Sequence, residues 1–490
     1  MVKPNKKALS ALGIALIAMS CPTQTAAQLP EGVRALVDQG EYSQAEELLR
    51  QAIDDPEGPV VGDAATELEI LRRTRIDYSL DREAALEQVR RALPSTTEQD
   101  FDRWTESGAL HHRMIDGQLR YFRKAPGNLF RLSEEASQRR QEHRRQQTDR
   151  PRPAGRELFS MTEHVRGLVA QAAETDETLI RPMRHRIRYA LWVEPGHPRV
   201  KPGAEVRAWL AYPQAYQQQG EPRLISSTPE AKEIAPNGSP HRTVYFEHTI
   251  GEDGAPPRFE VEYEYTISAV CSKLDPDGVQ PYRTDDETYT RYTSERAPHI
   301  VFTPEVRELV AEVVGDEENP LTKARLIFRW VSDNIPWIGE REYGTIRSLS
   351  QKGLSARCGD CGVQGMVFVT LCRAAGVPAR WQSGWELRPG AWGMHDWSEM
   401  YLEPWGWLPV DASYGVRKDD DPRVRDFFCG SMDPYRLIVN LDYARPLVPK
   451  KTSFRSEPND FQRGEIEIDG HNLYFDEWRY SIEVESSRIE

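Results

Sequence analysis

The residue best suited to chemistry is a cysteine in the segment RCGDCGVQGMVFVTLCRAAGVPAR. Apolar residues recur there at helical spacing, Asp360 is a favourable N-cap, and Gly376 followed by Pro378 is a helix stop. The pattern predicts a helix over about 361–375 that begins at Cys361. Free N–H groups and the helix dipole at that end favour a thiolate, the attacking form of cysteine. Cys361 is therefore the candidate nucleophile.

Two glycines and a second cysteine surround this candidate. Gly359 and Gly362 carry no side chains, so we expect room for a substrate beside the sulfur. Cys358 and Cys361 form a C-x-x-C pair, which is typical of redox pairs and of half a zinc site. Cys372 lies about 16 Å along the same helix, so these thiols do not converge on zinc. A reversible Cys358–Cys361 disulfide that silences the nucleophile stays open as a regulatory hypothesis.

A candidate base and its carboxylate partner follow in the segment GMHDWSEMYLEPWGWLPVDAS. His395 opens an extended stretch, a turn lies near residues 403–406, and Asp411 lies on the returning stretch. A symmetric hairpin would place His395 opposite Tyr414, so pairing with Asp411 requires a bulge or a longer turn. In a triad, His395 would act as general base and then acid for Cys361, and Asp411 would fix the imidazole tautomer.

The elements that must position these residues begin after an N-terminal export signal. Residues 1–27 contain three lysines, an apolar run and then small residues, which is the pattern of a signal peptide. Cleavage after Ala27 fits better than lipid attachment at Cys21, whose preceding residues match a lipoprotein site poorly. No other stretch approaches about 18 uninterrupted apolar residues, so no transmembrane span is predicted. We expect a periplasmic or secreted protein.

Beyond the signal, the hydrophobic period predicts a multidomain chain. Residues 28–180 form a helical region with an Arg- and Pro-rich linker near residues 139–156. The period changes to two over residues 181–295, which predicts an antiparallel domain like a β-sandwich. Helices return in residues 296–445, the predicted catalytic core, and residues 446–490 form a C-terminal strand extension that closes onto an earlier domain.

The charge of the chain limits its partners. Its 77 acidic and 63 basic side chains give a formal net charge of −14, so nucleic acid is not the expected partner. The acidic run at residues 419–421 lacks the spaced ligands and the glycine of a calcium loop. We therefore expect no metal ion and no cofactor. A protein or peptide substrate is the expected partner.

Four ordered motifs within residues 303–433 resemble the core of the transglutaminase-like superfamily. They are Gly-x-Cys at 359–361, Gly-Val-Pro-Ala-Arg at 376–380, His-x-Trp-x-Glu at 395–399 and Trp-x-Pro-Val-Asp at 407–411. The resemblance implies an α+β papain-like fold in which Cys361, His395 and Asp411 form a catalytic triad.

The same resemblance bears on the oxyanion. The backbone N–H of Cys361 is the natural first donor, because it points from the helix start toward the developing charge. The resemblance implies a tryptophan before the nucleophile as a second donor. Trp337 is the best-placed candidate, and Trp330 and a plain core role for Trp337 are the alternatives.

These observations predict an exported cysteine enzyme of the transglutaminase-like class. Cys361 would attack a Gln side chain or a peptide amide to give a thioester. Water would resolve the thioester by deamidation or proteolysis and an amine by cross-linking; the resemblance to bacterial members favours hydrolysis. The alternative is a non-catalytic envelope scaffold or binding protein, because about three quarters of the chain lies outside the motifs.

Overall fold

The structure of the protein is a computed structural model. It describes residues 30, 32–55, 61–147 and 159–489. The predicted signal and the Pro-rich end of the predicted linker therefore lie outside the described residues. None of the helices within these ranges is long and apolar enough to cross a membrane.

The chain divides into two compact units, residues 1–69 and residues 70–490. The first unit contains α1 (Val33–Gln39), α2 (Tyr42–Asp54) and the first half of α3 (Val61–Asp77). Tyr42, Ala45 and Leu49 are buried along one side of α2, at the three- and four-residue spacing of an amphipathic helix.

The second unit starts with helices and a β-hairpin around an apolar cluster of their own. These elements are α4 (Arg82–Ala92), α5 (Glu98–Glu106), β1 (His112–Ile115), β2 (Gln118–Tyr121), α6 (Ala125–Leu132) and α7 (Glu134–Gln147). The hydrophobic period of this region predicts only helices, so the hairpin corrects that prediction. Asp116 and Gly117 have φ values of 49° and 74°, the geometry of a tight Asp-Gly hairpin turn. Two strands of four residues are too short to show a period of two.

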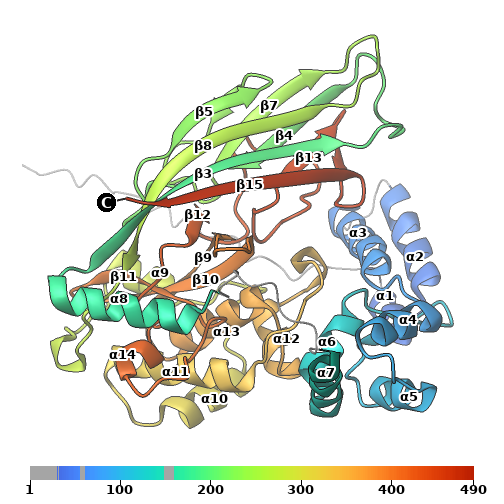
Figure 1. Cartoon of the computed structure of the whole chain (residues 1–490). Coiled ribbons are helices and arrows are strands. Elements are labelled where there is room, and N and C mark those ends of the chain that lie inside the picture. Colours follow the sequence, from blue (N-terminus) through green and yellow to red (C-terminus); the bar gives the residue numbers. More distant parts are fainter. Residues whose placement is uncertain (1–29, 31, 56–60, 148–158, 490) are drawn as a thin grey trace, which may run out of the picture. The chain divides into compact units, whose positions relative to one another are not determined.

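Two antiparallel sheets face each other across an apolar core (Figure 1). One has the order β15-β3-β8-β5, with β3 (Leu179–Val193), β5 (Arg223–Thr228), β8 (Arg258–Val270) and β15 (Trp478–Arg488). The other has the order β14-β13-β4-β7-β6, with β4 (Glu205–Ala211), β6 (Glu233–Ile234), β7 (Thr243–Thr249), β13 (Glu465–Ile468) and β14 (His471–Leu473). The C-terminal strands thus pair with the earlier ones, β13 with β4 and β15 with β3.

A smaller four-stranded sheet carries the predicted base. Its order is β11-β10-β9-β12, with β9 (Ala379–Glu386), β10 (Gly393–Leu402), β11 (Gly406–Val410) and β12 (Arg436–Asn440). One face packs against helices; the other sends Trp385, Leu437 and Val439 into the core of the two larger sheets. The sheet therefore lies between a helical layer and the sandwich.

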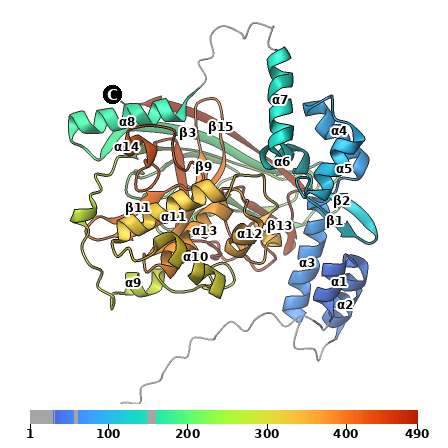
Figure 2. The same cartoon turned by 90° about the horizontal axis from the view of Figure 1, so that it is seen from below.

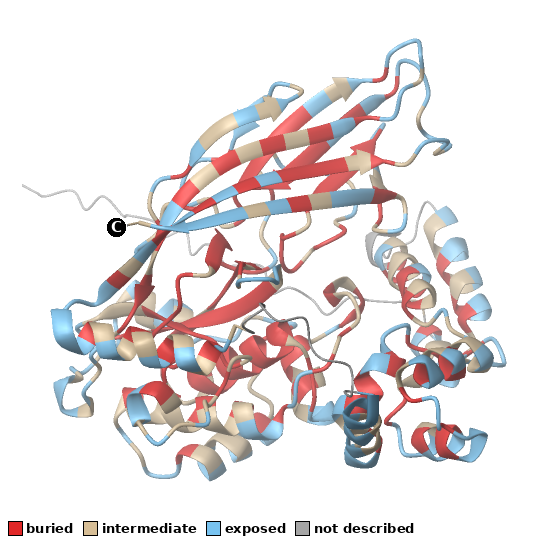
Figure 3. Ribbon diagram, viewed as in Figure 1, coloured by how far each residue is buried: buried red, intermediate tan, exposed pale blue. Residues whose placement is uncertain are grey.

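The helical layer holds the predicted nucleophile. It comprises α10 (Pro304–Val314), α11 (Pro320–Asn334), α12 (Leu349–Ala356) and α13 (Cys361–Ala374), with α9 (Glu287–Tyr292) and α14 (Pro422–Arg425) nearby (Figure 2). Residues 361–373 are all buried, so α13 is enclosed rather than buried along one stripe (Figure 3). α8 (Met161–Thr175) lies within the predicted N-terminal helical region, residues 28–180, but its Val165 and Leu168 pack into this core cluster.

The molecule is therefore a mixed α/β protein with helices and several sheets.

Candidate active site

The helix that carries the candidate nucleophile forms as predicted. α13 begins at Cys361 and ends at Ala374. The Asp360 carboxylate accepts a hydrogen bond from the Val363 N–H at 3.3 Å, which is the predicted N-cap. On the strand beside it, the Ser398 hydroxyl donates to the helix carbonyl of Gly365 at 3.1 Å. The cap and the strand contact together fix the start of α13.

The thiol contacts a carboxyl outside the predicted triad. Cys361 Sγ lies 3.5 Å from Oδ2 of Asp396, the residue after His395 on β10. Among the described residues, the hydrogen bond of the thiol goes to Asp396 rather than to His395. Burial, then the charges of Asp396 and Asp360, raise the pKa of Cys361 well above its usual value. The expected thiolate is therefore wrong for the resting site, because burial and two carboxyls outweigh the helix dipole.

The predicted histidine and aspartate are brought together. His395 Nε2 lies 2.8 Å from Asp411 Oδ2, and both side chains are buried. Ser398 pairs with Val410 across β10 and β11, so the same register continued places Asp411 opposite Trp397. His395 and Asp411 are therefore diagonal neighbours on one face of the sheet. The symmetric hairpin pairs His395 with Tyr414 and the bulged hairpin pairs it with Asp411, so neither prediction gives this register.

A buried arginine holds the aspartate from its other side. Arg436 Nη1 lies 2.9 Å from Asp411 Oδ2, and Arg436 Nη2 lies 2.8 Å from Asp433 Oδ2. Burial alone would raise the pKa of Asp411, but the charges of His395 and Arg436 hold it at about 2. Burial would lower the pKa of His395, but Asp411 raises it above its usual value. The pair therefore favours an imidazolium over a neutral carboxyl.

Tyr343, in the short 3₁₀ helix Tyr343–Thr345, joins the two carboxyls nearest the thiol. Its hydroxyl lies 2.8 Å from Asp360 Oδ1 and 2.9 Å from Asp396 Oδ2, and it accepts the Gly362 N–H at 3.1 Å. A hydroxyl has one proton, so one carboxyl accepts it and the other must be protonated and donate. Burial first of all raises the pKa of Asp360 to about 7 and that of Asp396 to about 6. These carboxyls therefore share a proton near neutral pH.

The glycines beside the thiol do not leave open space. A Cβ on Gly362 would lie 2.2 Å from the Tyr343 hydroxyl oxygen and 2.7 Å from the Trp381 ring. A Cβ on Gly359 would lie 2.3 Å from a Val363 methyl group. Other side chains of the chain fill both places, so the expectation that these glycines make room for a substrate is wrong.

A cavity of about 240 Å³ opens beside the sulfur on another side. Its lining is mostly polar and comes from the residue before α6, the segment before α12, the start of α13, β10, the loop before β13 and β15. The lining residues are Lys124, Trp337, Glu340, Arg341, Glu342, Tyr343, Asp360, Cys361, Met394, Asp396, Asp460, Gln462, Arg463 and Tyr480. The cavity therefore borders the thiol.

Of the two tryptophans considered for the oxyanion, Trp337 lines this cavity. Its segment runs beside Gly359, and the Ile338 N–H donates to the Gly359 carbonyl at 3.0 Å. Trp330 instead packs against the core cluster, with the Arg357 guanidinium 4.9 Å from its ring centre. Position in the structure therefore favours Trp337 over Trp330 as the candidate donor.

The helical region reaches the cavity through Lys124, the N-cap of α6, and is fastened to the segment that lines it. The Asn128 amide makes two 2.8 Å hydrogen bonds to the backbone of Gly339, one to its carbonyl and one from its N–H. Lys124 Nζ donates to the Glu340 carbonyl at 2.8 Å. Sequence reasoning missed these contacts, because pairings across more than two hundred residues leave no local pattern.

The remaining predictions near the thiol concern cysteine and metal chemistry. Cys271, Cys358, Cys361, Cys372 and Cys429 are all buried free thiols. The Cys358–Cys361 disulfide therefore stays a hypothesis. Within the described part of the chain, no group of three or more His, Cys, Asp or Glu side chains is arranged to hold a metal ion.

Comparison with known proteins assigns a family to this region. Residues 307–412 match the model of the transglutaminase-like superfamily, and the matched span contains Cys361, His395 and Asp411. The chain contains a transglutaminase-like core. The match ends one residue after Asp411, so the helical region and the larger sheets lie outside it.

Similar proteins match more loosely. A Haemophilus influenzae protein described as uncharacterized is 32% identical over 162 residues, 27% of this chain and 41% of the relative. The chain thus spans less than half the length of this curated relative. A Cytophaga hutchinsonii protein named a putative cysteine protease aligns over 64% of this chain and 92% of its own, at 15% identity and a TM-score of 0.42. The periplasmic domain of Pseudomonas aeruginosa TgpA aligns over 51% and 91%, at 17% identity and a TM-score of 0.24. Both TM-scores are too low to establish a common fold.

Proposed function

We propose that the protein is an exported cysteine enzyme that forms a thioester at Cys361 from a Gln side chain or a peptide amide. The observation that carries the proposal is the convergence on β10. His395 is bound to Asp411 at 2.8 Å, and the next residue, Asp396, contacts the thiol at 3.5 Å. The thiol at the start of α13 thus lies beside the strand that carries His395, which supports acyl transfer.

The roles follow from the chemistry of each group. His395 takes the proton of the Cys361 thiol, and the sulfur attacks the carbonyl carbon. The Cys361 N–H and the Trp337 indole stabilise the oxyanion. His395 then protonates the departing amine and activates the water that hydrolyses the thioester. Asp411 fixes the imidazole and stabilises its charged form.

Arg436 is a positioning residue in this scheme. It is fully buried and contacts Asp411 at 2.9 Å without reaching the cavity lining. Its charge keeps Asp411 ionised, and ionised Asp411 stabilises the imidazolium that forms during attack.

The export signal and the cleavage after Ala27 complete the proposal, which places the enzyme in the periplasm or outside the cell. The support is the lysine-rich, apolar and small-residue pattern of residues 1–27.

The test is mass spectrometry of a glutamine-containing peptide incubated with the protein, with and without a primary amine. A gain of about one dalton shows deamidation, a shorter peptide shows proteolysis, and an amine adduct shows cross-linking. Cys361→Ala is the control and should give none of these products. If the wild-type protein forms no product, the proposal fails.

A non-catalytic scaffold is the second candidate, and the raised pKa of the buried Cys361 thiol favours it. Alkylation by iodoacetamide separates the two. A catalytic Cys361 reacts faster than buried Cys372, and His395→Ala slows it. Equal and slow reaction of both thiols would support the scaffold.

A further inference from the structure

Another cavity, of about 430 Å³, is separate from the candidate active site. It shares no lining residue with the cavity beside Cys361, and its walls come from α8, α11, α14 and the segments that follow β8 and α14. α8 and α14 lie side by side in both views (Figure 1, Figure 2). The lining residues are Val169, Ala172, Ala173, Cys271, Ser272, Lys273, Leu274, Asp275, Arg325, Pro422, Arg423, Asp426, Phe427, Cys429 and Ser431. A cavity of this size is large enough for a small organic molecule.

The apolar part of this lining is continuous with the main core. Ala172 of α8 and Phe427 belong to the core cluster that contains the middle of α13. Val169 and Leu274 pack against that cluster. A ligand that covers these side chains removes apolar surface from water, which favours binding.

Most of the charged lining groups already have partners within the chain. The ion pairs are Lys273 with Asp176, Arg423 with Asp421, and Asp426 with Arg329. Asp275 is exposed, and its carboxylate accepts the Asp277 N–H at 3.1 Å. These groups therefore do not require a ligand.

Arg325 differs from these groups, because it takes part in no ion pair with a residue that the structure describes. Its Nη2 donates to the Leu274 carbonyl at 3.4 Å. Its Nε is buried and has no hydrogen-bond partner among the described residues. Burial raises the pKa of Cys429 to about 12 and the charge of Arg325 opposes this rise, so the guanidinium lies near that lining thiol. A buried N–H without an acceptor costs free energy, and an anion in the cavity would satisfy it.

The segments that form the wall are hydrogen-bonded to one another. Ser272 donates from its backbone N–H to Ser431 Oγ at 3.0 Å and from its hydroxyl to the Gly430 carbonyl at 2.6 Å. The Phe428 carbonyl, next to lining residue Phe427, accepts the backbone N–H of the predicted triad aspartate at 2.8 Å. The cavity is therefore preformed, which lowers the entropic cost of binding.

We propose that this cavity binds a small carboxylate with an apolar body, and that Arg325 donates hydrogen bonds to the carboxylate. The two oxygens of a carboxylate match two parallel N–H groups of one guanidinium. The apolar body then covers the side chains of α8 and Phe427. A ligand with an ammonium in place of the carboxylate would be repelled by the same guanidinium. The inference does not depend on the reaction proposed for Cys361.

Calorimetry with three ligands of the same chain length tests the charge preference. Octanoate carries the carboxylate, octanol is uncharged, and octylammonium carries a positive charge. We expect the wild-type protein to bind octanoate at least about tenfold more tightly than octanol, and octylammonium no more tightly than octanol. Equal dissociation constants for octanoate and octanol overturn the inference.

Arg325→Gln removes the charge and keeps a polar side chain. We expect it to weaken octanoate binding about tenfold and to leave octanol binding unchanged. Arg307→Gln, at an exposed position of α10 outside the cavity lining, is the matched control and should bind both ligands like wild type. An Arg325→Gln protein that binds octanol normally and octanoate with wild-type affinity overturns the inference.

Photolabelling of the wild-type protein locates the ligand without any variant. The probe is an aliphatic carboxylate with a diazirine in its chain. Light expels dinitrogen from the diazirine, and the resulting carbene inserts into a nearby C–H, N–H or O–H bond. We expect the label in peptides that contain residues 169–173, 271–275 or 427–431, and we expect excess octanoate to suppress it. Labelling confined to other peptides, or labelling here that octanoate does not suppress, overturns the inference.

Discussion

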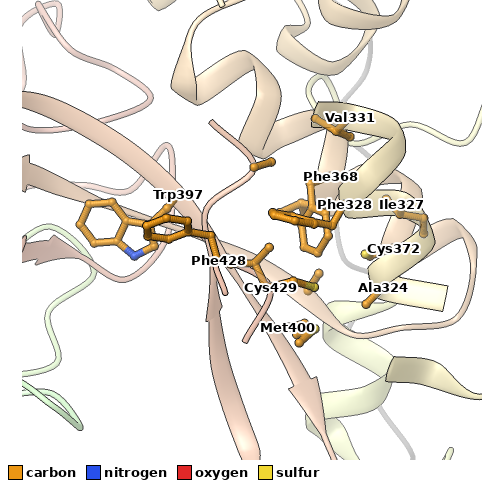
Figure 4. Packing of buried hydrophobic residues seen from close by; sticks show 14 of the residues in the cluster. Ala324, Ile327, Phe328, Val331, Phe368, Cys372, Trp397, Met400, Phe428 and Cys429 are labelled. Atoms are coloured by element: carbon orange, nitrogen blue, oxygen red, sulfur yellow. The ribbon is translucent and has the colours of Figure 1, made fainter. Parts of the chain in front are cut away.

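The two ends of α13 carry the same residue type in opposite surroundings. Cys361 begins the helix, borders a polar cavity and lies 3.5 Å from Asp396. Cys372 lies in the last turns among Phe328, Phe368 and other apolar side chains (Figure 4). Burial is the largest cause that raises the pKa of each thiol. Burial and the direction of the pKa shift therefore do not distinguish the two thiols. The polar neighbours of Cys361 and the cavity beside it do.

The difference shows what a helix start contributes to a nucleophile here. The dipole at the start of α13 does not ionise Cys361, because burial and two nearby carboxyls act against it. What the helix supplies is position. Its enclosed apolar middle packs against β10 and holds the sulfur beside this strand, which also carries His395.

Replacing each cysteine by alanine should have the largest effect on activity and should distinguish the two ends of α13. Cys361→Ala should lower product formation from a glutamine peptide about 10⁴-fold, because no other group replaces the nucleophile. Cys372→Ala should keep activity but lower the free energy of unfolding by about 1–2 kcal/mol, because it leaves a void in the core. Mass spectrometry and urea unfolding measure the two effects. A folded Cys372→Ala protein as inactive as Cys361→Ala would contradict the comparison.

The elements around these thiols differ in how far the sequence predicts them. The helix and its Asp360 cap follow from apolar spacing and a local hydrogen bond, and both form as expected. The alternation from Phe259 to Ile267 likewise predicts a strand, and β8 covers it. Such local patterns determine elements. They leave the order of strands in the sheets open, because pairing depends on contacts between distant segments.

The residues of the site also differ in how far the sequence predicts them. His395 and Asp411 are close enough in sequence for a hairpin to bring them together. Their diagonal register is visible only in the structure. Tyr343, Arg436 and Asp460 come from separate segments outside the motifs. Asp396 lies between His395 and Trp397, at the variable position of the His-x-Trp motif. A charged residue next to the predicted base is the one feature of the sequence that points to it.

Removing the carboxyl of Asp396 tests what controls the ionisation of Cys361 at the N-terminal end of α13. Asp396→Asn should lower the pKa of Cys361, because the charge of Asp396 raises it. The midpoint of alkylation against pH should therefore shift down by about one unit for Cys361 and stay in place for Cys372. Iodoacetamide rates over a pH series, resolved by peptide fragmentation, measure both. A midpoint that stays or rises for Cys361 would show that Asp396 does not set its ionisation.

The last prediction concerns the cap itself and the stability of this end of the helix. Burial raises the pKa of Asp360 from 3.8 to about 7. The folded state therefore keeps a proton between about pH 4 and pH 7 that the unfolded state has lost, so this contribution to stability falls as the pH rises through that window. Asp360→Asn still caps α13 but cannot ionise. Relative to wild type, its free energy of unfolding should rise from the acid to the neutral side of the window, by up to about 1.4 kcal/mol for each pH unit.

The exposed cap of α4 provides the matched control for this change. Asp81 accepts a hydrogen bond from the Ala84 N–H at 2.8 Å, so it performs the same local task as Asp360 at the surface. Asp81→Asn should change the free energy of unfolding by nearly the same amount at every pH. Urea unfolding of the two variants and wild type across the window measures the difference. Parallel pH profiles for Asp360→Asn and wild type would mean that Asp360 holds no proton of its own, and that Asp396 carries the shared proton beside the thiol.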